Sequence, residues 1–137
     1  MEQDKWTFIT RELIGAAFEV RKQLGRFLYE EVYEQALQYE LHLRGIRSER
    51  QVFLPISYKG VQLEKSYRID LLVENSVIVE LKALEYMGGK EISQILTYLK
   101  FSNLNVGYLI NFGVEDFSIG RIGENEILDK GIYRFAL

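Results

Sequence analysis

The apolar residues recur first with the period of a helix and later with that of short strands. From Ile9 to Leu24 they recur at steps of three and four, which predicts a helix over residues 5–24. A second run of the same kind predicts a helix over residues 28–44. Each run ends at a glycine, Gly25 or Gly45, which is a common stop signal for a helix.

From residue 47 onward, β-branched and aromatic runs alternate with turn residues. They predict strands over residues 51–58 and 77–83 and, between these two, one strand that begins at 61–63 and continues over 66–73. Pro55 indicates an edge or a bulge, and Lys59-Gly60 a turn. A helix over residues 90–101 precedes a buried strand over 106–112, which we expect to run parallel to a neighbour after this crossover. Short strand-like pieces follow at residues 118–122 and 132–135.

This order, α-α-β-β-β-α-β plus short C-terminal strands, predicts a mixed sheet covered by helices, in the α/β or α+β class. The 137 residues, 47% of them apolar and 27% charged, fit a single globular domain over residues 1–137. No stretch is apolar enough to span a membrane, so we expect no membrane partner. The polar, acidic first residues do not resemble a secretion signal, and we therefore expect a cytoplasmic protein.

Three charges interrupt the apolar runs of residues 69–73 and 77–82, at Asp70, Glu80 and Lys82. If residues 74–76 form a three-residue loop, 73 pairs with 77, 71 pairs with 79, and Asp70 lies opposite Glu80; a two-residue loop would shift this register by one. Glu80 and Lys82 then project from the same face. Opposed side chains are about 5 Å apart at Cβ, so two carboxylates could hold one divalent cation.

Charges inside a buried strand are costly unless they are paired or bound to metal. Lys82 could simply pair with one of the acids, or the strand ends could be hydrated. Because three charges converge from two strands, we favour a functional site. The chain has no cysteine and a single histidine, His42, so any metal must be held by oxygen ligands, which indicates Mg²⁺ or Mn²⁺.

The net charge of −3 does not favour nucleic-acid binding. Residues 44–68, however, hold six basic side chains against two acidic ones, Glu49 and Glu64. This segment is either a local basic face or an ordinary solvated mixture of charges.

An aspartate on one strand, Glu-x-Lys on the next and Gln-x-x-x-Tyr on the following helix form a known pattern. Here these residues are Asp70, Glu80-Leu81-Lys82, Gln94 and Tyr98. The pattern resembles the PD-(D/E)xK nuclease superfamily, which has a restriction-endonuclease-like core. The resemblance covers about residues 9–113 and leaves 114–137 as a C-terminal extension.

More narrowly, the chain is similar to the small bacterial GxxExxY proteins of this superfamily. Glu30 and Tyr33 supply the second half of that motif, but Phe27 stands where its glycine is expected. We expect the nearby Gly25 to take over part of that glycine's role.

The resemblance implies that Asp70, Glu80 and the backbone carbonyl of Leu81 bind Mg²⁺ or Mn²⁺. Glu30 would add a further carboxylate, and Glu40 is the weaker alternative. Lys82 would orient a water or stabilise developing charge, while Gln94 and Tyr98 would support the site or contact the nucleic acid.

The implied reaction is phosphodiester hydrolysis in DNA or RNA. One alternative is a nuclease fold that binds nucleic acid or a protein without turnover, and another is a structural protein in which Lys82 neutralises two acids. The resemblance also allows a homodimer.

Overall fold

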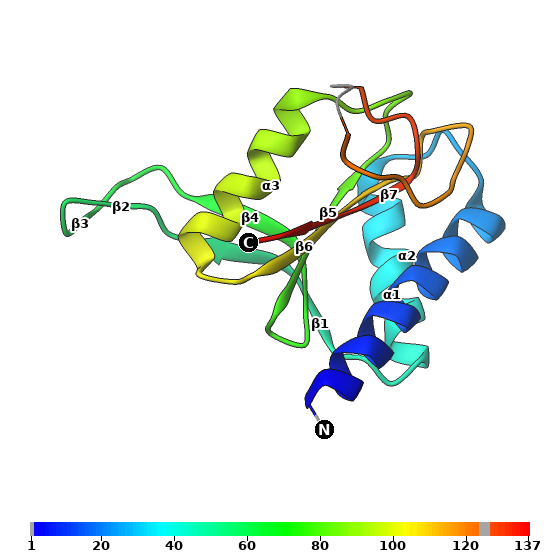
Figure 1. Cartoon of the computed structure of the whole chain (residues 1–137), viewed down its shortest axis with the longest axis horizontal. Coiled ribbons are helices and arrows are strands. Elements are labelled where there is room, and N and C mark those ends of the chain that lie inside the picture. Colours follow the sequence, from blue (N-terminus) through cyan, green and yellow to red (C-terminus); the bar gives the residue numbers. More distant parts are fainter. Residues whose placement is uncertain (1, 124–126) are drawn as a thin grey trace.

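The computed structural model describes residues 2–123 and 127–137. In this part of the chain, three helices pack on a five-stranded mixed sheet (Figure 1). The helices are α1 (Glu2–Leu24), α2 (Glu30–Leu43) and α3 (Gly89–Ser102). The sheet has the order β1 (Ser48–Leu54), β4 (Tyr67–Val73), β5 (Val77–Lys82), β6 (Val106–Asn111), β7 (Ile132–Ala136). A separate small hairpin is formed by β2 (Ser57–Tyr58) and β3 (Val61–Gln62).

The element order predicted from the sequence is confirmed. β5 and β6 are parallel, as expected for strands joined by the α3 crossover, and the other neighbouring strands are antiparallel. β1 ends at Leu54, directly before Pro55, because proline has no N–H to donate to a sheet ladder. The strand predicted over residues 118–122 is wrong, since only Ile119 makes an isolated bridge, to Ile132.

The sheet carries an apolar core on each face. One core joins α1 and α2 to the sheet, and it includes Leu13, Tyr33 and Val79. The other joins α3 to the opposite face, through Ile78 and Leu99. β5 is therefore covered on both sides, which explains its nearly continuous apolar sequence. No helix in the described residues is long and apolar enough to span a bilayer.

Within α3, the apolar residues Ile95 and Leu99 are buried, whereas Leu96 is exposed and Tyr98 is buried. Tyr98 lies four residues after Gln94, so burial of Tyr98 brings the polar pair predicted on this helix up to the sheet.

The turn between α1 and α2 contains two residues in the left-handed region of backbone space. Gly25 has a φ of +70°, and Phe27 has a φ of +72°. Position 27 therefore keeps a backbone conformation that suits glycine, even though Gly25 lies two residues before it. The Phe27 ring is 80% exposed and lies under the Arg26 guanidinium, 4.6 Å from the ring centroid. The phenylalanine therefore adds little burial to offset its unfavourable backbone conformation.

Phe27→Gly is expected to stabilise the protein by about 1 kcal/mol, because only glycine adopts this backbone conformation without a Cβ clash. For a chain of this length, that gain corresponds to a rise in melting temperature of about 3 °C. Thermal melts of wild type, Phe27→Gly and the matched Phe27→Ala test it. Alanine removes the ring but keeps the Cβ, so it should give little gain. A glycine variant that melts below the alanine variant would contradict this account.

Candidate active site

The hairpin of β4 and β5 opens at the position of the predicted acids. Its register is confirmed where the ladder is intact, with Val73 opposite Val77 and Leu71 opposite Val79. The three-residue loop is confirmed too, and its Glu74 and Asn75 adopt φ values of +50° and +56°. Beyond Leu71 the backbone ladder stops.

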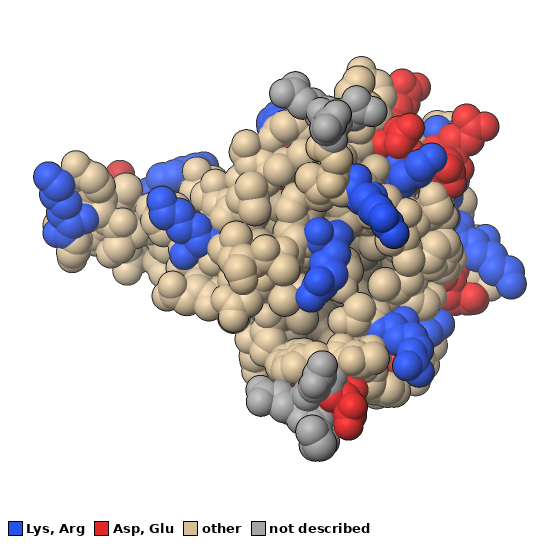
Figure 2. Space-filling view, viewed as in Figure 1, with Lys and Arg blue, Asp and Glu red and all other residues tan. Residues whose placement is uncertain are grey.

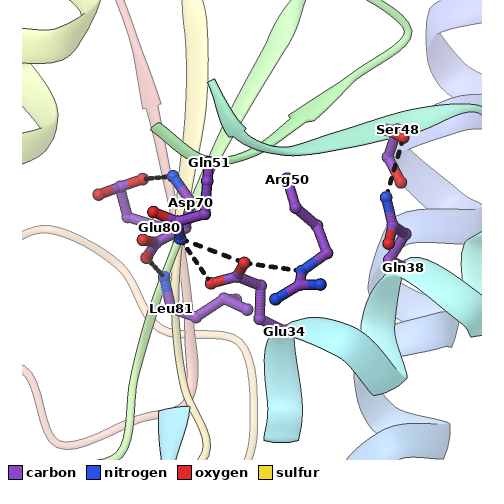
Figure 3. A network of polar contacts seen from close by, with 8 residues as sticks. All are labelled: Glu34, Gln38, Ser48, Arg50, Gln51, Asp70, Glu80 and Leu81. Atoms are coloured by element: carbon purple, nitrogen blue, oxygen red, sulfur yellow. Dashed lines mark hydrogen bonds and ion pairs between the residues drawn. The ribbon is translucent and has the colours of Figure 1, made fainter. Parts of the chain in front are cut away.

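Side chains replace the ladder at that point. The backbone N–H of Asp70 donates to Glu80 Oε2 at 2.7 Å, and the N–H of Leu81 donates to Asp70 Oδ2 at 2.9 Å (Figure 3). Each strand thus holds the carboxylate of the other strand with a backbone amide. The two acids are fixed side by side at the mouth of the opened hairpin, although they are not a backbone pair of the ladder.

Burial dominates the electrostatics of these two acids. It raises the pKa of Asp70 to about 6, the Leu81 amide opposes this rise, and the charge of Glu34 adds to it. Glu80 is only 1% exposed. Burial and then the negative charge of Asp70 hold the pKa of Glu80 well above its usual value. The ion pairs of the described residues do not include either acid, although the charge of Lys82 opposes the rise in the pKa of both.

Lys82 projects from the same face as Glu80 and reaches α3. Its Nζ donates to Gln94 Oε1 at 2.8 Å, and Gln94 Nε2 lies 3.1 Å from the Tyr98 hydroxyl. The lysine is therefore held by a neutral amide, and the ion pairs of residues 2–123 and 127–137 do not include it. Lys82, Gln94 and Tyr98 line a groove of about 590 Å³, together with Glu30, Tyr67, Leu84, Lys90, Glu91, Ser93 and Thr97.

Asn111, at the end of β6, fixes the chain that follows Lys82. Its side chain is fully buried, and its Oδ1 accepts the N–H of Leu84 at 2.9 Å and that of Gly113 at 3.0 Å. The N–H of Phe112 also donates to the carbonyl of Lys82 at 2.9 Å. These bonds hold the end of β5 against β6, so the backbone that carries Lys82 is rigidly placed.

A polar network that the sequence analysis missed lies beside the two acids. Glu34 of α2 is buried, and its carboxylate accepts from Arg50 Nε at 2.9 Å and from Gln51 Nε2 at 3.0 and 3.2 Å (Figure 3). Gln51 stands in β1 with a φ of +55°, at the one step where the pairing of β1 with β4 is interrupted, opposite Asp70. A non-glycine residue held in this region costs about 1–3 kcal/mol, and such residues gather at functional sites.

The sequence did contain a signal for Glu34. It lies three residues before Leu37 and seven before Leu41, which are both fully buried, and so it shares their face of the helix. Glu34 contributes to the raised pKa of both Asp70 and Glu80. It is thus the third acid of this region.

The structure separates the two acids that were considered on α2. Glu30, the first residue of the helix, is exposed, lines the groove with Lys82, and contributes to the raised pKa of Asp70. Glu40 instead accepts from Arg44 Nε at 2.9 Å and does not line the groove. Of the six predicted side chains, Glu30, Lys82, Gln94 and Tyr98 line one groove. Asp70 and Glu80 are not among its lining residues and lie in the hairpin that carries Lys82.

A family model described as the PD-(D/E)XK nuclease superfamily matches residues 7–122. The chain belongs to this superfamily. Neither the curated proteins nor the solved structures gave a significant match. The mixed sheet, with helices on both faces, agrees with the restriction-endonuclease-like fold of PD-(D/E)XK nucleases.

PD-(D/E)XK nucleases generally use divalent metals, and the donor set of this chain fits such an ion. Asp70 and Glu80 each use one oxygen to accept a backbone N–H, and two adjacent carboxylates suit a hard cation. In residues 2–123 and 127–137, no three acidic, histidine or cysteine side chains form a metal-binding group. A magnesium ion commonly takes only one or two carboxylates and keeps several waters, so the two acids are enough.

Proposed function

We propose that the chain is a Mg²⁺-dependent nuclease that hydrolyses phosphodiester bonds in DNA or RNA, with Mn²⁺ as an alternative ion. One observation carries the proposal: the half-buried carboxylate of Asp70 and the buried one of Glu80 lie side by side without a salt bridge among the described residues, and Lys82 projects from the same strand as Glu80. Burial raises the pKa of both acids, so ionising the two together is unfavourable unless a further positive charge lies between them. A bound cation gives this arrangement a physical reason.

In this proposal, Asp70, Glu80 and the carbonyl of Leu81 hold the metal, and Glu30 contributes from the edge of the groove through a water. The ion, when bound, would lower the pKa of a water and polarise the scissile phosphate. Lys82 stabilises the negative charge that develops on the phosphate, at a position fixed by Gln94. Tyr98 supports Gln94 in turn. Glu34 acts from behind the site, where it holds Gln51 and Arg50 in place.

Calorimetric titration of Mn²⁺ and Mg²⁺ into wild type and Asp70→Asn tests the metal site. Removal of a second-shell partner lowers metal affinity 10–100-fold in other proteins, so removal of a direct ligand should weaken binding at least about tenfold. Glu40→Gln is the matched control, because it neutralises a carboxylate of α2 that bonds Arg44. Equal affinity in wild type and Asp70→Asn would exclude Asp70 as a ligand.

The same two proteins are then incubated with duplex DNA, single-stranded DNA and RNA, with Mn²⁺ or with a chelator. The proposal expects wild-type cleavage that needs the metal and is lost in Asp70→Asn. Salt-dependent binding of nucleic acid without any cleavage would contradict the proposed nuclease activity and would indicate a binding module.

A further inference from the structure

A hairpin arm, residues 55–66, leaves the sheet between β1 and β4 and extends away from the body of the molecule (Figure 1). It contains β2 and β3, joined through Lys59 and Gly60 at φ values of +48° and +82°. None of its residues is buried, and none belongs to either apolar core. A two-stranded hairpin is marginal by itself, so packing of the protein interior does not explain why this chain carries the arm.

The charge of the arm differs from that of the whole chain. Lys59 and Lys65 on the arm, and Arg68 just beyond it, are exposed and take part in no ion pair of the described residues. The only acid in this segment is Glu64. The other basic residues of the 44–68 segment do have acidic partners: Arg44 with Glu40, Arg47 with Glu74, and Arg50 with Glu34.

Figure 2 shows where the basic and acidic side chains lie on one face of the molecule. Basic side chains follow the arm to its tip, whereas most of the acidic side chains in this view lie on the other side of the molecule. Exposed basic groups that are left without partners on a chain of net charge −3 fit a polyanion. Tyr58, 60% exposed at the turn, adds an aromatic surface beside Lys59.

The base of the arm reaches the candidate active site. Tyr67, the first residue of β4, directly follows the arm, and its ring centroid lies 5.5 Å from that of Tyr98. Tyr67 and Tyr98 line the same groove as Lys82. A nucleic acid that places a phosphate beside Lys82 would therefore pass Tyr67 and reach the arm.

The length of the arm sets how far such a contact extends. Lys59 lies eight positions before Tyr67, and an extended chain advances about 3.3 Å per residue. The tip thus lies at most about 26 Å from the groove. Phosphates along one strand of a duplex rise about 3.4 Å each, so this span matches about seven or eight nucleotides.

We propose that the arm binds the sugar–phosphate backbone on one side of the scissile bond, up to about eight nucleotides from it. This inference rests on the proposed nuclease function and adds to it a second contact, which raises affinity for long substrates. Lys59, Lys65 and Arg68 supply the charge, without reading sequence.

The test compares wild type with the triple variant Lys59→Gln/Lys65→Gln/Arg68→Gln. A matched control, Lys5→Gln/Arg11→Gln/Lys22→Gln, removes the same charge from exposed positions on α1. Binding of labelled 30-nucleotide duplex DNA, single-stranded DNA and RNA is measured by fluorescence anisotropy in chelator, over a range of salt. For duplex DNA, loss of three phosphate contacts should reduce the slope of log Kd against log salt by about 3. The arm variant should bind at least about tenfold more weakly near 0.1 M salt, with the control close to wild type.

Cleavage kinetics distinguish a contribution of the arm from a contribution of the active site. With Mn²⁺ and the 30-nucleotide substrates, the arm variant should show a KM raised at least about tenfold and a kcat close to that of wild type. If wild type cleaves and the arm variant matches it in both binding and KM, the arm proposal is overturned and the nuclease stands. If wild type never cleaves but its binding depends on the arm, the arm proposal is supported and the nuclease fails. Equally tight binding of polyglutamate would assign the arm to acidic proteins and overturn the proposal.

Discussion

Asp70→Asn is expected to raise the thermal stability of the metal-free protein at pH 8. Burial raises the pKa of Asp70 to about 6 in the folded chain, against an ordinary value of 3.8. The folded state therefore binds the proton more tightly than the unfolded state, and wild-type stability falls as the pH rises from about 4 through about 6. Asparagine carries no charge, and its side-chain oxygen can still accept the N–H of Leu81.

The expected gain at pH 8 is about 2 kcal/mol, after allowance for the part of the carboxylate that reaches solvent. For a chain of this length, it corresponds to about 6 °C in melting temperature. Below about pH 4 the wild-type carboxyl is also neutral in both states, so the gain should vanish. Melting curves in chelator at pH 8 and pH 3.5 measure the gain and its loss at low pH. Asp129→Asn is the control, because it neutralises an exposed carboxylate.

Bound metal should make wild type more stable than Asp70→Asn, the reverse of the order expected in chelator. Because a ligand that binds only the folded state stabilises it, Mn²⁺ at 100 times its Kd adds about 2.7 kcal/mol to wild type, and it should add far less to Asp70→Asn. An asparagine variant that melts several degrees below wild type in chelator would instead indicate that the carboxylate has a favourable structural role. The rival interpretation, in which Lys82 neutralises the two acids, predicts that outcome.

Most of the fold was predictable because local sequence and tertiary structure agree. The apolar periods of α1 and α2 end at Gly25 and Gly45, which have φ values of +70° and +77°. The loop length of the β4–β5 hairpin then determines its register. The short C-terminal segments were less predictable. Residues 118–122 have a strand-like composition, but Ile119 makes only a single bridge, so composition alone did not define a strand there.

The candidate site was only partly predictable. The hairpin acids, Lys82 and the Gln94–Tyr98 pair lie close together in sequence or follow a fixed spacing, and Lys82, Gln94 and Tyr98 line one groove. Glu34 was missed because its burial depends on Arg50 and Gln51, side chains 16 and 17 residues away. Helical periodicity gives the face of α2 that Glu34 occupies, but it cannot show which strand meets that face, or that Gln51 adopts a left-handed backbone there.

Lys82→Met is expected to lower the metal-dependent kcat at least about 100-fold, because in the proposed function this lysine stabilises charge that develops only in the transition state. Methionine has a similar length and shape and no charge. The fold should change little, since the Lys82 side chain is only half-buried and the Gln94 amide is its bonded partner. Affinity for Mn²⁺ should be kept or increased, because a positive charge near the two carboxylates is removed. Single-turnover cleavage, melting curves and calorimetry measure the three quantities separately.

Two variants of Gln94 show whether the position of the lysine matters as well as its charge. Gln94→Leu removes the acceptor that holds Lys82 Nζ at 2.8 Å, so kcat should fall, but less than in Lys82→Met, because the charge remains while its position is lost. Gln94→Glu restores an acceptor and should recover activity relative to Gln94→Leu. If Lys82→Met keeps more than about a third of the wild-type kcat, the ammonium group does not stabilise the transition state. Catalysis would then depend on the carboxylates and the metal alone.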